Sequence, residues 1–232
     1  KIILMSSEKK TYWKEIFIID NFFKKLLKYN RKKIHQIFIT STIYNNDTSI
    51  LDVGTSSTLD DNHNILLQET KNNKNIDCLS DQDLTKLITL KYSHVRKFIR
   101  GDGTNIDLKN NSYDTVYCSA TIEHVGCFKN QIKLIRELYR VSKKYVFITT
   151  PNKHYPIDFH TKLPLLHWLP KKIHRKILKF LGLEFYSLEE NLNLLNKKEL
   201  HKIMMILKIK NYKIISFKFL FFTSNLILVI KK

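Results

Sequence analysis

The most informative stretch of the sequence is SILDVGTS at residues 49–56. Residues 50–53 predict a short buried strand, and residues 54–56 predict a tight turn of small residues directly after it. A glycine at such a turn lets the backbone approach a ligand closely. The free N–H groups of a helix that follows would point at the same place. The stretch therefore predicts a ligand site at the end of a strand.

Two later stretches, RGDG at residues 100–103 and SYDTVYCS at residues 112–119, have the same character. Apolar runs predict five strands, and apolar residues at helical spacing predict helices between them. The predicted strands are 50–53, 75–79, 96–100, 113–119 and 145–149, and the predicted helices are 58–68, 84–90 and 129–142. This alternation with short connections is typical of an α/β fold with a Rossmann-like, doubly wound parallel sheet. In such sheets ligands bind at the carboxyl ends of the strands.

The two ends of the chain differ from this alternating pattern. Residues 12–38 have apolar positions at helical spacing, which predicts one or two amphipathic helices packed against the core. Residues 212–222 and 225–230 predict two strands joined by Thr223-Ser224, a hairpin that adds antiparallel pairing at one edge of the sheet. We expect a single domain over residues 1–232. Its predicted parts are an N-terminal helical segment (1–47), a cofactor-binding core (48–150), an acceptor-side helical lid insertion (151–198), and a C-terminal helix and hairpin (199–232).

The 232 residues carry a formal net charge of +19, and 43% of them are hydrophobic. We interpret the charge mainly as a compositional bias, because lysine is spread over the whole chain beside many asparagines and isoleucines. The alternative is a functional basic face for nucleic acid or an anionic membrane. Nucleic acid is the weaker alternative, since no RNA-binding signature or zinc-finger spacing occurs.

Several features predict a cytoplasmic protein. The odd number of cysteines (Cys78, Cys118 and Cys127) predicts free thiols, of which Cys78 and Cys118 lie in apolar runs and are expected to be buried. The apolar run at residues 1–5 is too short for a signal peptide, and no run of about 18 apolar residues predicts a spanning helix. Because the chain begins with Lys1, we expect it to start inside a longer product.

Acidic residues lie at or just after the ends of three of the predicted strands. The Asp52 carboxylate disfavours a pyrophosphate at the first turn and favours a cofactor with a cationic portion. Asp81 is suited to accept hydrogen bonds from ribose hydroxyls, although Ser80 is an alternative and a helix N-cap is an equal interpretation of Asp81. Asp102, between Gly101 and Gly103, is suited to accept from an adenine amino group. Neither a complete G-x-G-x-x-G nor a phosphate-binding G-x-x-x-x-G-K-[ST] is present.

Together these motifs resemble class I S-adenosylmethionine-dependent methyltransferases, and most closely the type 11 group. The stretches that carry the resemblance are LDVG at 51–54, GDG at 101–103, NSYDTV at 111–116, SATIEHV at 119–125, RELYRV at 136–141 and YVFITTPN at 145–152. The resemblance implies a seven-stranded sheet whose last strand is antiparallel. It implies S-adenosyl-L-methionine as the cofactor. The family's second motif glycine is replaced here by Ser56.

The resemblance also implies where the cofactor binds. It implies that the methionine end lies near Asp52, Gly54, Thr55 and Ser56, the ribose near Asp81, and the adenine near Asp102 and Gly103. It further implies that residues 119–124, beginning with Ser119, line the methyl-transfer face.

Three residues are candidates for a catalytic role. Glu123 and His124 lie in the predicted methyl-transfer loop, and His160 lies in the insertion, with His154 as an alternative. A general base contributes when the acceptor is a hydroxyl or a protonated amine. A structural role is the favoured interpretation of Glu123 and His124, and lid packing is an equal interpretation of the histidines of the insertion. We expect no metal site, since neither a H-E-x-x-H motif nor a H-x-x-x-H pair with a third ligand occurs.

Residues 163–178 combine bulky apolar residues with lysine and arginine, a pattern typical of a segment that lies on an anionic bilayer. We expect a methyltransferase for a small-molecule acceptor, with lipid- and glycan-linked molecules as candidates. A lid helix packed on its own domain is the favoured interpretation of this segment, and peripheral contact with the inner face of the membrane is the alternative. Two functional alternatives remain: an RNA-directed methyltransferase or RNA-binding homologue, and a non-catalytic Rossmann-like binding module.

Overall fold

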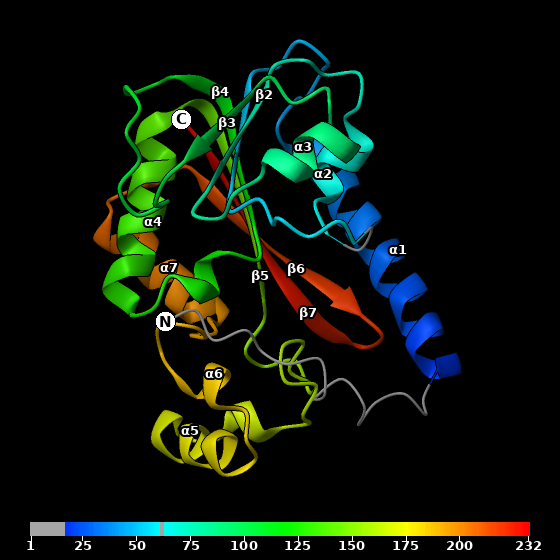
Figure 1. The fold of residues 1–232 in the computed structure, drawn as a ribbon. Coiled ribbons are helices and arrows are strands. Elements are labelled where there is room, and N and C mark those ends of the chain that lie inside the picture. The colour runs from blue at the N-terminus through cyan, green and yellow to red at the C-terminus, as the bar shows by residue number, and fades with distance from the viewer. Residues whose placement is uncertain (1–16, 61–62) are drawn as a thin grey trace.

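A seven-stranded sheet runs through the centre of the computed structural model, which describes residues 17–60 and 63–232, with side chains from residue 27 onward (Figure 1). The strand order is β3-β2-β1-β4-β5-β7-β6. Strands β1 to β5 are parallel to one another, and β7 pairs antiparallel with both β5 and β6. The strands are β1 Ile50–Val53, β2 Ile76–Ser80, β3 Lys97–Arg100, β4 Tyr113–Ser119, β5 Ser142–Pro151, β6 Tyr212–Phe219 and β7 Phe222–Lys231. This is the predicted seven-stranded fold with an antiparallel C-terminal hairpin.

Helices cover both faces of this sheet (Figure 1). One face packs against α4 and α7, and the other packs against α1, α2 and α3. Two more helices, α5 and α6, lie in the segment between β5 and α7. The bounds are α1 Phe17–Ser41, α2 Ile65–Glu69, α3 Thr85–Lys91, α4 Phe128–Val141, α5 Lys171–Phe180, α6 Glu184–Ser187 and α7 Lys197–Ile206. The helices predicted on both sides of the sheet are thus present, and the part of the N-terminal prediction before residue 17 lies outside the described residues.

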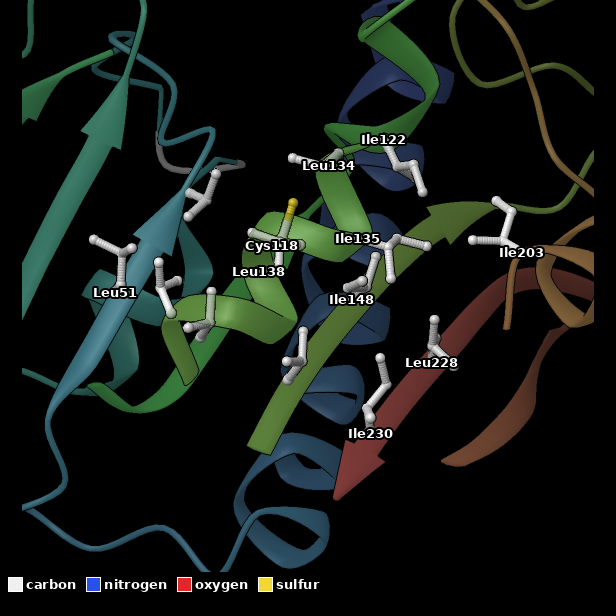
Figure 2. Packing of buried hydrophobic residues seen from close by; sticks show 14 of the residues in the cluster. Leu51, Cys118, Ile122, Leu134, Ile135, Leu138, Ile148, Ile203, Leu228 and Ile230 are labelled. Carbon is white, nitrogen blue, oxygen red and sulfur yellow. The ribbon is translucent and has the colours of Figure 1, made fainter. Parts of the chain in front are cut away.

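The core consists of two apolar layers, one on each side of the sheet. On the α4 side, Ile135 and Leu138 face Ile148 of β5, with Leu228 of β7 close by (Figure 2). On the other side, the Phe38 ring of α1 makes edge contacts with the rings of Tyr117 and Phe147, at centroid distances of 5.2 and 5.3 Å. Cys78 and Cys118 are buried and unpaired, as predicted. Within the described part of the chain, each helix is too short or too polar to cross a bilayer.

The first crossover helix is shorter than predicted. The sequence predicted a helix over residues 58–68, but α2 begins at Ile65. The reason is Asn64, whose backbone is left-handed (φ 53°) and whose side chain exchanges hydrogen bonds with the main chain of Ser56. These bonds hold Asn64 against the turn after β1, so α2 begins only after Asn64.

The hairpin turn also differs from its prediction. The sequence predicted a turn at Thr223-Ser224, but the two-residue turn is Leu220-Phe221, and Thr223 pairs with Lys218 inside the ladder. Ser224 is buried and its hydroxyl donates to the Phe217 carbonyl (3.3 Å). Two bulky apolar residues are unusual turn chemistry, and Leu220 adopts a positive φ of 49° there. Both side chains are exposed at the hairpin tip.

Candidate functional site

A cavity of about 790 Å³ opens at the carboxyl ends of β1, β2 and β4. Its volume lies within the roughly 300–1,000 Å³ typical of small-molecule sites. The structure brings nearly all of the predicted site residues to its walls. Those that line it are Asp52, Gly54, Thr55, Ser56, Asp81, Asp102, Gly103, Ser119, His124 and His160.

The turn after β1 is built around Gly54, which adopts a positive φ of 85°. A Cβ atom at this position would lie 2.1 Å from Thr121 Oγ1 and 2.8 Å from Thr121 Cβ. Only glycine therefore lets this turn pack against the loop that follows β4. The Gly54 N–H donates to the Leu79 carbonyl at 2.8 Å, which holds the turn against β2.

Asp52 is buried at the floor of the cavity. Its Oδ2 accepts a hydrogen bond from the Thr55 hydroxyl at 2.8 Å. Burial raises the pKa of Asp52 to about 7, and the hydrogen bond from Thr55 acts in the opposite direction. A buried carboxylate without a cationic partner is unfavourable, so this position favours a ligand that carries positive charge.

Ser56 occupies the place of the family's second glycine, and its main chain is held by Asn64. The Ser56 N–H donates to Asn64 Oδ1 at 3.0 Å, and Asn64 Nδ2 donates to the Ser56 carbonyl at 2.8 Å. This pair of hydrogen bonds fixes the turn without a glycine. Asn64 itself lines the cavity, and the sequence analysis did not identify it.

The residues after β2 separate the two candidates for the ribose contact. Ser80 is buried, and its hydroxyl donates to the Thr55 carbonyl at 2.9 Å. Asp81 is exposed and lines the cavity. Because the Ser80 hydroxyl is used within the protein, the geometry favours Asp81 as the acceptor for a ligand.

After β3, Asp102 begins a turn that its own carboxylate stabilises. The two oxygens accept from Thr104 N (2.8 Å) and Thr104 Oγ1 (2.7 Å). Gly103 packs tightly behind it, since a Cβ there would lie 2.9 Å from Leu134 Cδ1 and 3.1 Å from Val53 Cγ1. The absence of a side chain at Gly103 thus keeps α4 and β1 close to this wall of the cavity.

The opposite end of the cavity is formed by the loop after β4 and by the segment after β5. The loop turns at Ala120, which has a positive φ of 51°, and enters the single 3₁₀ turn Ile122–His124. Glu123 is completely buried, and its Oε2 accepts from the Thr150 hydroxyl at 2.9 Å. Its Oε1 is also buried and has no hydrogen-bond partner among the described residues.

His124 and His160 meet beside this carboxylate. Their Nε2 atoms are 3.2 Å apart, and His160 Nε2 is 3.9 Å from Glu123 Oε1. His160 Nδ1 lies 3.2 Å from Asp158 Oδ1, and His124 Nδ1 lies 2.7 Å from the Asn191 carbonyl. Burial lowers the pKa of His160, but the hydrogen bond to Asp158 and the charge of Glu123 outweigh it and raise this pKa. The structure therefore unites the three predicted catalytic residues in one cluster.

Other residues are placed differently from their predictions or were not predicted. His154 is exposed and is not among the cavity-lining residues, so the alternative to His160 is not supported by its position. Arg31 of α1 lines the cavity, and its buried Nη1 has no hydrogen-bond partner among the described residues. Phe159 and Tyr186 add aromatic walls at the His160 end. Their contribution depends on tertiary packing, which no local spacing reveals.

Comparisons with known proteins agree with this architecture. Residues 67–148, from α2 into β5, match a family model described as Methyltransferase domain, of type 11. A comparison with curated protein sequences gives no match.

Solved structures share the fold at low identity. An S-adenosylmethionine-dependent methyltransferase from Archaeoglobus fulgidus has a TM-score of 0.59 and 15% identity, over 93% of this chain and 99% of that one. One from Aquifex aeolicus has a TM-score of 0.55 and 12% identity, over 85% and 88%. Magnesium protoporphyrin IX methyltransferase from Synechocystis, solved with bound S-adenosylhomocysteine, has a TM-score of 0.54 and 12% identity, over 90% and 86%. Residues 67–148 thus match a methyltransferase domain, and the chain shares its fold with S-adenosylmethionine-dependent methyltransferases.

Proposed function

We propose that this methyltransferase transfers its methyl group to a hydroxyl of a small, lipid-linked acceptor that reaches the cavity from a membrane surface. In this proposal the methionine end of the cofactor lies at Asp52, Gly54 and Thr55. The ribose lies at Asp81, and the adenine lies beside Asp102. The acceptor then occupies the end of the cavity that the loop after β4 and the insertion line.

The choice of a hydroxyl rests on the polar groups at that end. Glu123 Oε1 and the imidazoles of His124 and His160 are all positioned to accept a hydrogen bond or a proton. A methyl acceptor that is an alcohol or phenol must lose its proton during transfer, whereas the sulfonium needs no activation. Positioning in line with the methyl group and exclusion of water supply the rest of the catalysis.

The apolar character of the acceptor rests on one observation: Phe185 both lines the cavity and is 56% exposed. Phe185 belongs to an apolar–basic face, which we define as the exposed large apolar residues from Trp168 to Leu188 together with three lysines of α5. The members are Trp168, Ile173, Phe180, Leu181, Phe185, Leu188, Lys172, Lys176 and Lys179. The cavity thus opens directly onto an apolar surface.

The charges and the hairpin tip fit a bilayer as the partner of this face. Glu189 pairs with Arg175 (3.3 Å) and Lys171 (3.8 Å), whereas the three lysines of the face have no ion pair among the described residues. The hairpin tip lies next to the insertion, because Phe219 contacts Tyr155 at a centroid distance of 6.2 Å. Phe221 at this tip is 94% exposed. Exposed aromatic residues beside unpaired lysines favour an anionic lipid surface.

Vesicle co-sedimentation tests the proposal. We expect the protein to sediment with phosphatidylglycerol-containing vesicles and much less with pure phosphatidylcholine vesicles, and we expect added salt to weaken the binding. Phe180→Ser should reduce binding about tenfold, because a buried aromatic side chain contributes roughly 1.5–3 kcal/mol. Leu90→Ser is the control, since Leu90 is comparably exposed but lies on α3, away from α5 and α6 (Figure 1). Equal vesicle binding by both variants, or none by the unmodified protein at low salt, would remove the membrane acceptor.

A further inference from the structure

The cluster of Glu123, His124 and His160 offers three ligand atoms that lie within 4.8 Å of one another. Two of them come from the loop after β4, and the third comes from the insertion, 36 residues further along the chain. No spacing motif in the sequence links the two segments, which is why the sequence predicted no metal ligands. The fold alone brings them together.

The hydrogen bonds of the two Nδ1 atoms determine whether the Nε2 atoms of His124 and His160 carry a proton or a free lone pair. A carbonyl oxygen only accepts, so His124 Nδ1 carries the proton that it shares with Asn191 O. His160 Nδ1 likewise donates to Asp158, whose Oδ1 also accepts from the His160 N–H at 3.0 Å. Each neutral imidazole therefore directs the Nε2 lone pair into the cluster.

A third lone pair comes from Glu123. Its Oε1 is fully buried, has no donor among the described residues, and lies 3.9 Å from His160 Nε2. Three electron pairs that converge on one point repel one another unless a cation lies between them. Either a shared proton or a metal ion supplies that positive charge.

We infer that these three residues bind a divalent first-row transition metal ion, such as Zn²⁺. Nitrogens bonded to zinc at about 2.0–2.1 Å lie about 3.3 Å apart in tetrahedral geometry, and the two Nε2 atoms are 3.2 Å apart. Two ligand atoms of one ion can lie at most two metal–ligand bond lengths apart, about 4.2 Å. Glu123 Oε1 and His160 Nε2 are 3.9 Å apart, which is within this limit. Two imidazoles and one carboxylate form a donor set for such ions and leave further positions open.

The surroundings of the cluster match those of a metal site. Metal-binding histidines nearly always donate their other ring N–H to a carboxylate or a backbone carbonyl, which orients the ring. Asp158 does this for His160, and the Asn191 carbonyl does it for His124. Asp158 is itself fixed by the Thr161 hydroxyl, which donates to Oδ2 at 2.7 Å. Histidine orientation is thus set before an ion binds.

The open side of this site faces the cavity, since His124 and His160 both line it. For this step the inference rests on the proposed function: the acceptor hydroxyl oxygen would take an open position on the ion. The ion acts as a Lewis acid that favours loss of the hydroxyl proton to water in the cavity. The oxygen–methyl bond then forms while the methyl–sulfur bond breaks, and that electron pair stays on sulfur, which gives a methyl ether, S-adenosylhomocysteine and one released proton.

Metal titration of the purified chain tests the inference. After treatment with a chelator, the protein should bind one Zn²⁺ per chain by calorimetry. Co²⁺ should give the visible absorption of a low-symmetry four- or five-coordinate site, whereas Mg²⁺, which prefers oxygen ligands, should bind far more weakly. Glu123→Gln, His160→Gln and the exposed-side variant His124→Gln should each lose the Co²⁺ spectrum. Asp158→Asn should weaken Zn²⁺ binding about 10- to 100-fold.

His154→Gln is the matched control, because this exposed histidine lies in the same insertion outside the cluster. It should leave the Zn²⁺ affinity unchanged. Equal Zn²⁺ affinity of the unmodified chain and His124→Gln would overturn the inference, as would an equal loss in His154→Gln. S-adenosylhomocysteine binding, measured on the same samples, separates the two proposals: cofactor binding without metal binding removes only the metal site. Metal binding without vesicle binding removes only the membrane acceptor.

Discussion

Substitution of Gly54 by alanine tests whether the turn after β1 is built against the loop that follows β4. Two costs add. Alanine in the left-handed region, here φ 85°, costs about 1–2 kcal/mol. The new Cβ would also lie 2.1 Å from Thr121 Oγ1 and 2.8 Å from Thr121 Cβ, so rotation of the Thr121 side chain does not relieve the overlap. Overpacking of this kind costs about 1–3 kcal/mol. We expect Gly54→Ala to lower the free energy of unfolding by about 2–5 kcal/mol.

Gly182 provides the control for the backbone cost. It has a similar φ of 72°, and a Cβ there would meet nothing within 4 Å. Gly182→Ala should therefore cost only the backbone share of about 1–2 kcal/mol. Urea unfolding followed by far-ultraviolet circular dichroism measures both variants. In a double-mutant cycle, Thr121→Ala should recover part of the loss at Gly54, since it removes the nearest atoms. Equal destabilisation by Gly54→Ala and Gly182→Ala, with no coupling to Thr121, would refute the reasoning.

Three further predictions concern the cofactor end and the core. The pKa of Asp52 of about 7 predicts that affinity for S-adenosylmethionine rises between about pH 6 and pH 8, as the carboxylate ionises, and that Asp52→Asn removes this dependence in calorimetric titrations. Because folding raises this pKa, the empty protein should lose stability as the pH rises from about 4 to 7. Arg31→Met should weaken cofactor binding about 10- to 100-fold, since a hydrogen bond to a charged group contributes about 1.5–3 kcal/mol. The free energy of unfolding of this variant should not fall, and a parallel loss of stability would show a structural role instead. Phe38→Ala should cost about 3–5 kcal/mol in urea unfolding, because the ring is buried against Tyr117 and Phe147. A cost below about 1 kcal/mol would mean that α1 is not part of the core.

The meeting of Asp52, Gly54, Asp81 and Asp102 around one cavity could be predicted because its signals are local. A strand that ends in a small-residue turn at Gly54, and acidic residues at the ends of the next two strands, lie on the same sheet edge in any parallel sheet of this order. The parallel part of the sheet followed from the alternation of strands and helices, and the antiparallel hairpin followed from two apolar runs near the C-terminal end. The position of the hairpin turn did not, because Leu220 and Phe221 lack turn chemistry while Thr223 and Ser224 have it.

The acceptor end could be predicted only as separate residues. Glu123, His124 and His160 were identified one by one, but their meeting depends on how the insertion folds back over the loop after β4. The buried Arg31 guanidinium was not identified, because its position depends on the packing of α1 against β4 and β5. Such contacts between distant segments leave no periodic pattern in the sequence.

The central claim is that the cavity at the ends of β1, β2 and β4 binds S-adenosylmethionine, and calorimetric titration with this cofactor and with S-adenosylhomocysteine tests it most directly. The account predicts one site per chain with micromolar affinity for both ligands. It also predicts loss of binding in Asp81→Ala and Asp102→Ala, with unchanged binding in the remote variant Gly182→Ala. Absence of binding heat for a folded sample, or binding that all three variants retain, would contradict it.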